Sequence, residues 1–355
     1  MNNATYVADW VSAPGETMTE MLDESSRSVC DLASHLGWSV AALEALMSGE
    51  QALSEKVAAT LAAFFDTTTS FWLKRESQFR AGLEAIEANG GSEWVKKLPL
   101  ADMVTYQWVC EGNESYNLIR CLNFFGCSGV AEWQRRYGDA LNGALFRKTT
   151  TFDSEVESVS AWLRQGERLA KVVNVQPWNP IGLRALLPSL KALSRVSDPS
   201  RFLPELARLC SSIGIAVVIV RTPQKCPASG AARFLSAEKA VIQLSFRHLS
   251  DDHFWFSFFH EVGHLLLHGG KIYLEGTESQ DGNEENEANE FAADVLVPSA
   301  ERARMMKLGE DTRAIVRFAT QVGTSPGIVV GQMQHYGAIK HGRMNALKKR
   351  YVWGS

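Results

Sequence analysis

The chain has 355 residues, of which 45% are hydrophobic and 21% charged, and its formal net charge is −4. This length suggests two or three domains, and the nearly balanced charge excludes a general affinity for nucleic acids or anionic membranes. No apolar run reaches the roughly eighteen residues of a membrane-spanning helix, and no basic segment followed by an apolar one predicts a signal peptide. The six cysteines form no CxxC pair, so we expect reduced thiols in a cytoplasmic protein.

Residues 10–88 carry the signals of a bundle of short helices. A proline–glycine pair opens the first helix, serines cap the following ones, and glycines end two of them. These residues are Pro14, Gly15, Ser28, Gly37, Ser39, Gly49, Ser54 and Ser70. Two short helices around a glycine-containing turn, at residues 28–49, are typical of a helix-turn-helix. The order of the elements from PGETMTEML to SFWLKRESQFR resembles the Cro/repressor-like domain of HigA-type antitoxins.

The resemblance implies that the helix within residues 39–47 enters the major groove of operator DNA. The sequence of this helix, SVAALEALM, presents no Arg, Lys, Gln or Asn to base edges. Residues 1–66 contain ten acidic side chains and two basic ones, Arg27 and Lys56, which gives a net charge near −8. Because DNA affinity depends on neutralising phosphates, this charge argues against operator binding. Three roles stay open for this region: operator binding, protein binding or homodimerisation, and a structural remnant.

Residues 93–178 are expected to form a mostly helical middle region. The polar, glycine-rich segment at 89–92 marks its start, and VQPWNP, with two prolines, marks its end near residue 179. Between them, apolar residues recur at helical spacing in several stretches, including NLIRCLNFFG and SEVESVSAWLRQGERLAKVV. Residues 179–355 are then expected to form a third domain.

The last region combines two short β-strands with an apolar helix. IAVVIV at 215–220 and KAVIQLS at 239–245 are candidate strands, which predicts a small sheet. They are followed by FWFSFFHEVGHLLLH at 254–268, which is apolar nearly all round and therefore buried as a helix. Polar side chains in such a helix need partners, and a metal ion is an economical one.

The polar side chains of this helix form the pattern HExxH. His260 and His264 lie one turn apart on the same face, so both imidazoles can bind one zinc ion, and Glu261 can reach a water at the metal. His268 is a poor third ligand, because residues eight apart on a helix lie about 12 Å apart along its axis. We expect Glu287 to be the third ligand, since it lies beside the apolar stripe of a predicted helix, ENEANEFAADVLVP.

Several segments together resemble the ImmA/IrrE family of zinc metallopeptidases, which are often found behind a repressor-like helix-turn-helix. These segments are GAARF, AVIQLS, FWFSFFHEVGHLLLH, NEANEFAADVLVP and GIVVGQMQHYG, within about residues 200–355. The resemblance implies that His260, His264 and Glu287 bind Zn²⁺ and that Glu261 is the catalytic base. It also implies that the protein cleaves a repressor-type protein or acts with a toxin partner.

The sequence therefore predicts an α+β, mostly helical protein. Its parts are a helix-turn-helix bundle, a helical middle region and a zincin-like (gluzincin) domain with a small sheet. The expected function is that of a zinc-dependent endopeptidase coupled to a repressor- or antitoxin-like domain. The alternative is an antitoxin or transcriptional regulator that binds operator DNA and a toxin, with a mainly structural metal. The group that stabilises the oxyanion cannot be assigned from the spacing of residues in the sequence. His253, His335 and Tyr336 are the candidates.

Overall fold

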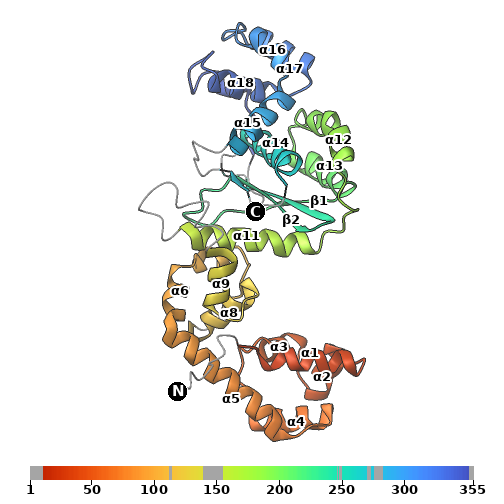
Figure 1. Ribbon diagram of the computed structural model, residues 1–355, viewed down its shortest axis with the longest axis vertical. Coiled ribbons are helices and arrows are strands. Elements are labelled where there is room, and N and C mark those ends of the chain that lie inside the picture. The colour runs from red at the N-terminus through yellow and green to blue at the C-terminus, as the bar shows by residue number, and fades with distance from the viewer. Residues whose placement is uncertain are drawn as a thin grey trace, which may run out of the picture. The chain divides into compact units, whose positions relative to one another are not determined.

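The computed structural model describes residues 11–111, 114–138, 155–245, 247, 250–269, 273–275 and 283–351. The chain divides into two compact units, Met1–Ala144 and Leu145–Ser355 (Figure 1). This arrangement differs from the expected division into 10–88, 93–178 and 179–355. Helix α11 (Glu155–Lys171), expected in the middle region, packs against the sheet of the second unit. The proline-rich segment that follows also lies in this unit, where the backbone N–H of Trp178 donates to the carbonyl of Glu238 (2.8 Å).

Five helices form the first part of the first unit. They are α1 (Pro14–Glu24), α2 (Val29–Leu36), α3 (Val40–Met47), α4 (Glu55–Phe65) and α5 (Thr69–Ile86). Each helix from α2 to α5 follows a serine or threonine whose side chain accepts an N–H of the first turn. Gly37 ends α2 with a φ of +67°, which lets the chain turn directly into α3. Leu32, Leu43, Leu61 and Trp72 join these helices in one apolar core.

Three basic side chains of this part are engaged within it. Arg27 donates a hydrogen bond to a backbone carbonyl at the end of α4 (2.7 Å). Arg75 donates to the hydroxyl of Ser12 (2.9 Å), and Arg80 pairs with Glu76 (2.7 Å). Arg75 and Arg80 lie just beyond the acidic segment, where free cations would offset its charge. Arg75 instead joins α5 to the segment before α1, and Arg80 pairs within α5.

Further short helices complete the first unit. They are α6 (Ser92–Lys97), α7 (Leu100–Thr105), α8 (Asn117–Phe125) and α9 (Val130–Trp133), with π-helical turns at Glu87–Gly91 and Gln134–Gly138 and a 3-10 turn at Glu114–Tyr116. Four aromatic rings pack these helices together with centroids 5.4 to 6.2 Å apart: Trp94, Phe125, Trp133 and Tyr137. Residues 139–154 of the expected middle region lie outside the described residues.

The second unit contains a four-stranded sheet of order β1-β3-β2-β4. The strands are β1 (Ile215–Ile219), β2 (Gly230–Ser236), β3 (Lys239–Leu244) and β4 (Tyr273–Glu275). β1 pairs with β3 in parallel, with Ile215 opposite Ala240, while β2 runs antiparallel to both β3 and β4. The sequence indicated β1 and β3 but placed β2 in a loop, because its first residues are glycine and alanine, which have low strand propensity.

Helices cover both faces of this sheet (Figure 1). On one face, α11 packs beside β1 and β3, and its backbone carbonyls accept hydrogen bonds from the side chains of Arg233 (2.7 Å) and Gln243 (2.6 Å). On the other face, Ala232, Ile242 and Leu244 share an apolar core with α14 (Asp251–Leu267). α12 (Pro180–Leu193) and α13 (Pro199–Ser211) contribute to the same core. The HExxH helix is thus packed against the sheet.

The remaining helices of the second unit follow α14 in the chain. They are α15 (Asn283–Leu296), α16 (Ser299–Met305), α17 (Thr312–Val322) and α18 (Pro326–His335), with a 3-10 turn at Asn345–Leu347. α15 packs across α14, and α18 packs against α14 from another side. Among the described residues, no helix combines the length and the apolarity needed to cross a bilayer. The fold is α+β and mostly helical, as the sequence predicted.

Candidate metal centre

The helix α14 buries three polar side chains among aromatic ones. Its residues Trp255, Phe258 and Phe259 are fully buried in the core of the second unit. His260, Glu261 and His264 are 1%, 0% and 0% exposed. The apolar residues of the sequence FWFSFFHEVGHLLLH therefore anchor the helix, and the burial of its polar side chains follows from that anchoring.

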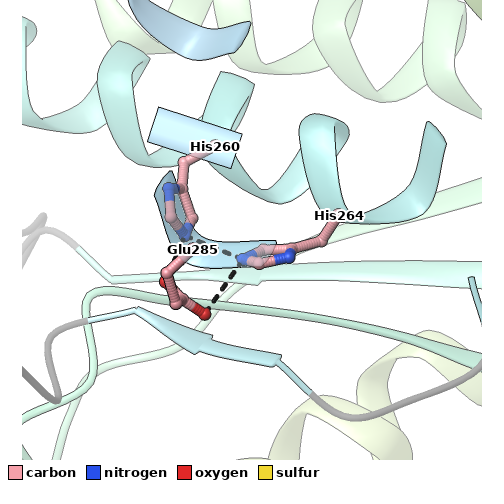
Figure 2. Close-up of side chains that lie close together, drawn as sticks. All are labelled: His260, His264 and Glu285. Atoms are coloured by element: carbon pink, nitrogen blue, oxygen red, sulfur yellow. Dashed lines mark hydrogen bonds and ion pairs between the residues drawn. The ribbon is translucent and has the colours of Figure 1, made fainter. Parts of the chain in front are cut away.

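Three ligand atoms converge between α14 and α15 (Figure 2). The Nε2 atoms of His260 and His264 lie 2.9 Å apart. One carboxylate oxygen of Glu285 lies 3.2 Å from Nε2 of His260, and the other lies 3.3 Å from Nε2 of His264. Glu285 comes from the first turn of α15, so the packing of α15 across α14 brings it to the histidine pair.

The expected third residue, Glu287, does not face this pair. Its Oε2 atom lies 3.0 Å from Nε2 of His268, and its side chain is 48% exposed. Residues two apart on a helix point about 200° apart, so Glu285 and Glu287 cannot face the same point. The sequence did contain a signal for Glu285, which lies three residues before Ala288 and seven before Ala292, both buried. Glu285 therefore shares the buried stripe, and the expectation for Glu287 is corrected.

The outer nitrogen of His260 is held by a side chain of α15. Nδ1 of His260 lies 3.0 Å from the amide oxygen of Asn289. An amide oxygen only accepts hydrogen bonds, so Nδ1 of His260 carries the proton. The neutral ring then presents the lone pair of Nε2 to the point where Glu285 and His264 converge.

A longer chain of hydrogen bonds holds His264. Its Nδ1 lies 3.1 Å from Nδ1 of His268, whose Nε2 lies 3.0 Å from the Glu287 carboxylate. Asn283 donates to the other oxygen of Glu287 (2.5 Å). A carboxylate only accepts, so Nε2–H of His268 donates to Glu287; when the His268 ring carries this one proton, its Nδ1 accepts from Nδ1–H of His264. The lone pair of Nε2 on His264 is therefore also directed at the centre.

This arrangement fits a divalent metal ion. Two nitrogen lone pairs that face each other at 2.9 Å repel, and a cation between them removes that repulsion. Zinc–nitrogen bonds of about 2.0–2.1 Å in tetrahedral geometry place ligand atoms about 3.3 Å apart. The distances of 2.9, 3.2 and 3.3 Å in this cluster are close to that spacing. Two histidines and one glutamate are a known ligand set of catalytic zinc sites, and they leave a fourth position open.

The protonation states of these residues suit metal binding. Burial raises the pKa of Glu285, but hydrogen bonds and charge interactions with His260 and His264, in the forms that carry a proton on Nε2, outweigh burial and lower it to about 2. Burial lowers the pKa of His264, assisted by the neighbouring His260, although the hydrogen bond to Glu285 opposes this change. At neutral pH the carboxylate is therefore ionised and the imidazole of His264 is neutral, which are the forms that bind metals.

The carboxylate of Glu261 faces the start of β2. A Cβ atom at Gly230 would lie 2.5 Å from Oε1 of Glu261, which is closer than two non-bonded atoms can approach. Gly230 pairs with Leu244 of β3 and with Glu275 of β4. A glycine at this position of the strand thus leaves room for the buried carboxylate. Sequence reasoning missed Gly230, because β2 itself was not expected.

A pocket of about 680 Å³ lies on the other side of Asn289, the residue that holds His260. We call it the α14–α18 pocket, since α14, α15 and α18 line most of it. Asn289, which holds His260, is part of its wall. The three side chains among which the sequence did not choose, His253, His335 and Tyr336, all line this pocket. The pocket therefore brings His253 of α14 together with His335 and Tyr336 at the end of α18.

Comparison with known proteins agrees with this geometry. A search of the curated proteins finds no match to this chain. Residues 211–331, which extend from the end of α13 into α18 and include His260, Glu261, His264 and Glu285, match a family model of peptidases. This segment is similar to the Peptidase_M78 family, described as the IrrE N-terminal-like domain, and supports a metallopeptidase-type function for the second unit.

Proposed function

We propose that this protein is a zinc-dependent endopeptidase that cleaves a regulatory or partner protein. The observation that carries the proposal is the convergence of His260, His264 and Glu285, with the lone pairs of both Nε2 atoms directed at one point. The similarity of residues 211–331 to a peptidase family supports it. The cleaved protein is expected to be of the repressor or toxin type, in keeping with the α2–α3 pair of the first unit.

In this proposal His260, His264 and Glu285 hold the ion, and Glu261 moves the proton. A bound zinc ion would polarise a peptide carbonyl and would lower the pKa of the attacking water to about 7. Glu261 accepts the proton of that water and delivers it to the leaving amine. Asn289 and His268 keep the two imidazoles oriented through their outer nitrogens.

The sheet offers a surface for the substrate. Among the described strands, β4 lies at the edge of the sheet, beyond β2 and next to α14. An extended peptide can add to such an edge through backbone hydrogen bonds. Gly230 of β2 is opposite Glu275 of β4 and also contacts Glu261. With a peptide on this edge, β4 would lie between the peptide and β2, the strand beside the proposed base.

The test combines metal analysis with cleavage of a randomised peptide library. The wild-type chain is expected to carry one zinc ion and to cut peptides, as measured by mass spectrometry. Glu261→Gln should keep the zinc and lose about 10²- to 10⁴-fold in rate, because only the proton transfer is removed. His260→Ala should lose both the zinc ion and the cleavage activity. A wild-type chain that binds no zinc, or a Glu261→Gln variant that cleaves at the wild-type rate, would contradict the proposal.

The alternative of an operator-binding regulator finds less support in the geometry. The contacts of Arg27, Arg75 and Arg80 lie within the first unit. The exposed positions of α3 include Val40, Ala41 and Glu44, which offer few groups to base edges. The peptidase proposal does not depend on this part of the chain.

A further inference from the structure

The helices α14 and α15, which carry the candidate metal ligands, come close together at a glycine. A Cβ atom at Gly263 of α14 would lie 3.2 Å from the Cα atom of Ala288 in α15 and 3.2 Å from Cδ1 of Phe291. Non-bonded carbon atoms attract most strongly at about 3.5–4.0 Å, so a side chain at this position would press against the backbone of α15. Ala288 is fully buried, so this contact lies inside the protein. The glycine therefore lets α15 pack directly on the backbone of α14.

The backbone conformation of Gly263 does not explain the choice of glycine. The residue lies inside α14 and is not among the described residues with a positive φ. At such a position glycine is less favourable to a helix than alanine, because it loses more conformational freedom on folding. What glycine contributes here is the absence of a side chain facing Ala288 and Phe291.

The contact lies between the groups that bind or orient the metal. On α14, Gly263 comes three residues after His260. On α15, Ala288 comes three residues after Glu285 and directly before Asn289. The Glu285 carboxylate lies 3.2 Å from Nε2 of His260, and the Asn289 amide oxygen lies 3.0 Å from its Nδ1. Both distances join α14 to α15 within about one helical turn of the contact, so both depend on how closely the two helices approach.

We propose that Gly263 is a positioning residue, which sets the distance of α15 from the histidine pair and thereby the affinity of the site for its metal. A methyl group at this position would push α15 outwards by a few tenths of an ångström, on the order of the missing contact distance, and would move Glu285 and Asn289 with it. Distances in metal sites vary by only about 0.2 Å, so this shift is large enough to weaken binding. The inference rests on the proposed function, in which this site holds zinc, and it adds the feature that places the third ligand.

Competition against a chromophoric chelator tests the proposal on the full chain. Gly263→Ala should bind zinc about 10- to 100-fold more weakly than the wild type, which is the effect usually seen when the groups that support metal ligands are disturbed. Gly263→Val, with a larger side chain, should bind zinc more weakly still. Leu267→Ala is the control, because Leu267 lies on the same helix but is 43% exposed. Wild-type affinity in Gly263→Ala, or an equal loss in Leu267→Ala, overturns the proposal.

Two spectroscopic measurements separate a displaced ligand from a general loss of structure. In chains loaded with cobalt(II), the visible absorption of the ion reports its ligands, and the spectrum of Gly263→Ala should differ from that of the wild type. In the metal-free chains, the proton on Nδ1 of His260 reports the hydrogen bond to Asn289. Because this bond should lengthen, the NMR signal of the proton should move to a lower chemical shift in Gly263→Ala. A wild-type signal in either measurement shows that α15 has not moved and overturns the proposal.

Failure of this inference is distinguishable from failure of the proposed function. A wild-type chain that binds zinc but cuts no peptide contradicts the peptidase, while the weaker zinc binding of Gly263→Ala would still support the role of the glycine. A wild-type chain that binds zinc and cuts peptides, with an unchanged affinity in Gly263→Ala, overturns the inference alone. A wild-type chain that binds no zinc overturns both.

Discussion

The two units bury different kinds of side chain, although both are mostly helical. In the first, the described core consists of apolar residues such as Leu32 and Leu61, and the buried charged residues are Glu76 and Arg120. Glu76 pairs with Arg80 at 2.7 Å, and Arg120 pairs with Glu50 at 3.1 Å. In the second, a single helix buries two histidines and a glutamate in addition to its aromatic residues.

This difference indicates where the function lies. Burying imidazoles and carboxylates costs free energy unless they are paired or bind a metal. The second unit bears part of that cost where His260, His264 and Glu285 converge. Its other buried charges include the ion pairs of Arg164 and Arg233 with Glu167. Local departures from the rules of stability are expected at functional sites. The predictions below test whether the polar residues of the second unit serve metal binding and catalysis.

The largest expected effect separates Glu285 from Glu287. Removing a ligand from a three-residue site should weaken zinc binding about a thousandfold or more, so Glu285→Ala is expected to lose the ion. Glu287 acts only through His268, and Glu287→Ala should weaken zinc binding about 10- to 100-fold. Competition against a chromophoric chelator measures both affinities. His268→Ala is expected to match Glu287→Ala, because it interrupts the same chain of hydrogen bonds.

A third glutamate of α15 supplies the control. Glu290 is exposed and pairs with Arg302 on the surface, so Glu290→Ala should leave the zinc affinity unchanged. A larger loss in Glu287→Ala than in Glu285→Ala would reverse our correction and make Glu287 the ligand.

The helix of the HExxH pattern was predictable because its signal is local. The spacing of His260 and His264 and the apolar residues around them determine both the helix and the shared face. The caps at Ser28, Ser39 and Ser54 made the first helices predictable for the same reason. In each case the residues that specify the element are neighbours in the sequence.

The parts of the site that escaped prediction depend on contacts between distant segments. The choice between Glu285 and Glu287 depends on the rotation of α15 against α14, and the polar residues of that helix left its buried face ambiguous. β2 was missed because its pairing with β3 and β4 compensates for weak local propensity. The tertiary packing that forms the α14–α18 pocket also brings Asp252 and Gln332 together from distant positions.

A smaller effect is expected at Gly230, which contacts the proposed base. Gly230→Ala would place a methyl group 2.5 Å from Oε1 of Glu261 and force that carboxylate to shift. Such a displacement should reduce the rate of peptide cleavage about a hundredfold while zinc affinity stays close to the wild-type value. The rate and the zinc affinity are measured on the same preparation. Ser236→Ala, at the exposed end of the same strand, is the control, and equal rates in both variants would contradict a role for this contact.

The smallest effect concerns Asp251, at the start of α14. Burial raises the pKa of Asp251 to about 6, even though Ser325 and the backbone N–H of Lys349 donate hydrogen bonds to it at 2.7 and 2.9 Å. The neighbouring Asp252 contributes to the increase. The folded state therefore binds this proton more tightly than the unfolded state, in which the pKa is about 3.8. The resulting stabilisation is complete below about pH 4 and is lost as the pH rises through about 6.

Asp251→Asn, which cannot ionise, makes this contribution measurable. The measured quantity is the difference in the free energy of unfolding between the wild type and Asp251→Asn. Between pH 4 and pH 7, the wild type should lose up to about 3 kcal/mol relative to the variant. Urea unfolding of the metal-free chain at several pH values gives this difference and excludes any effect of pH on zinc binding. A difference that stays constant with pH would show that Asp251 does not titrate in this range. The buried carboxylate would then owe its position to its hydrogen bonds with Ser325 and Lys349, which tie the start of α14 to α18 and to the C-terminal segment.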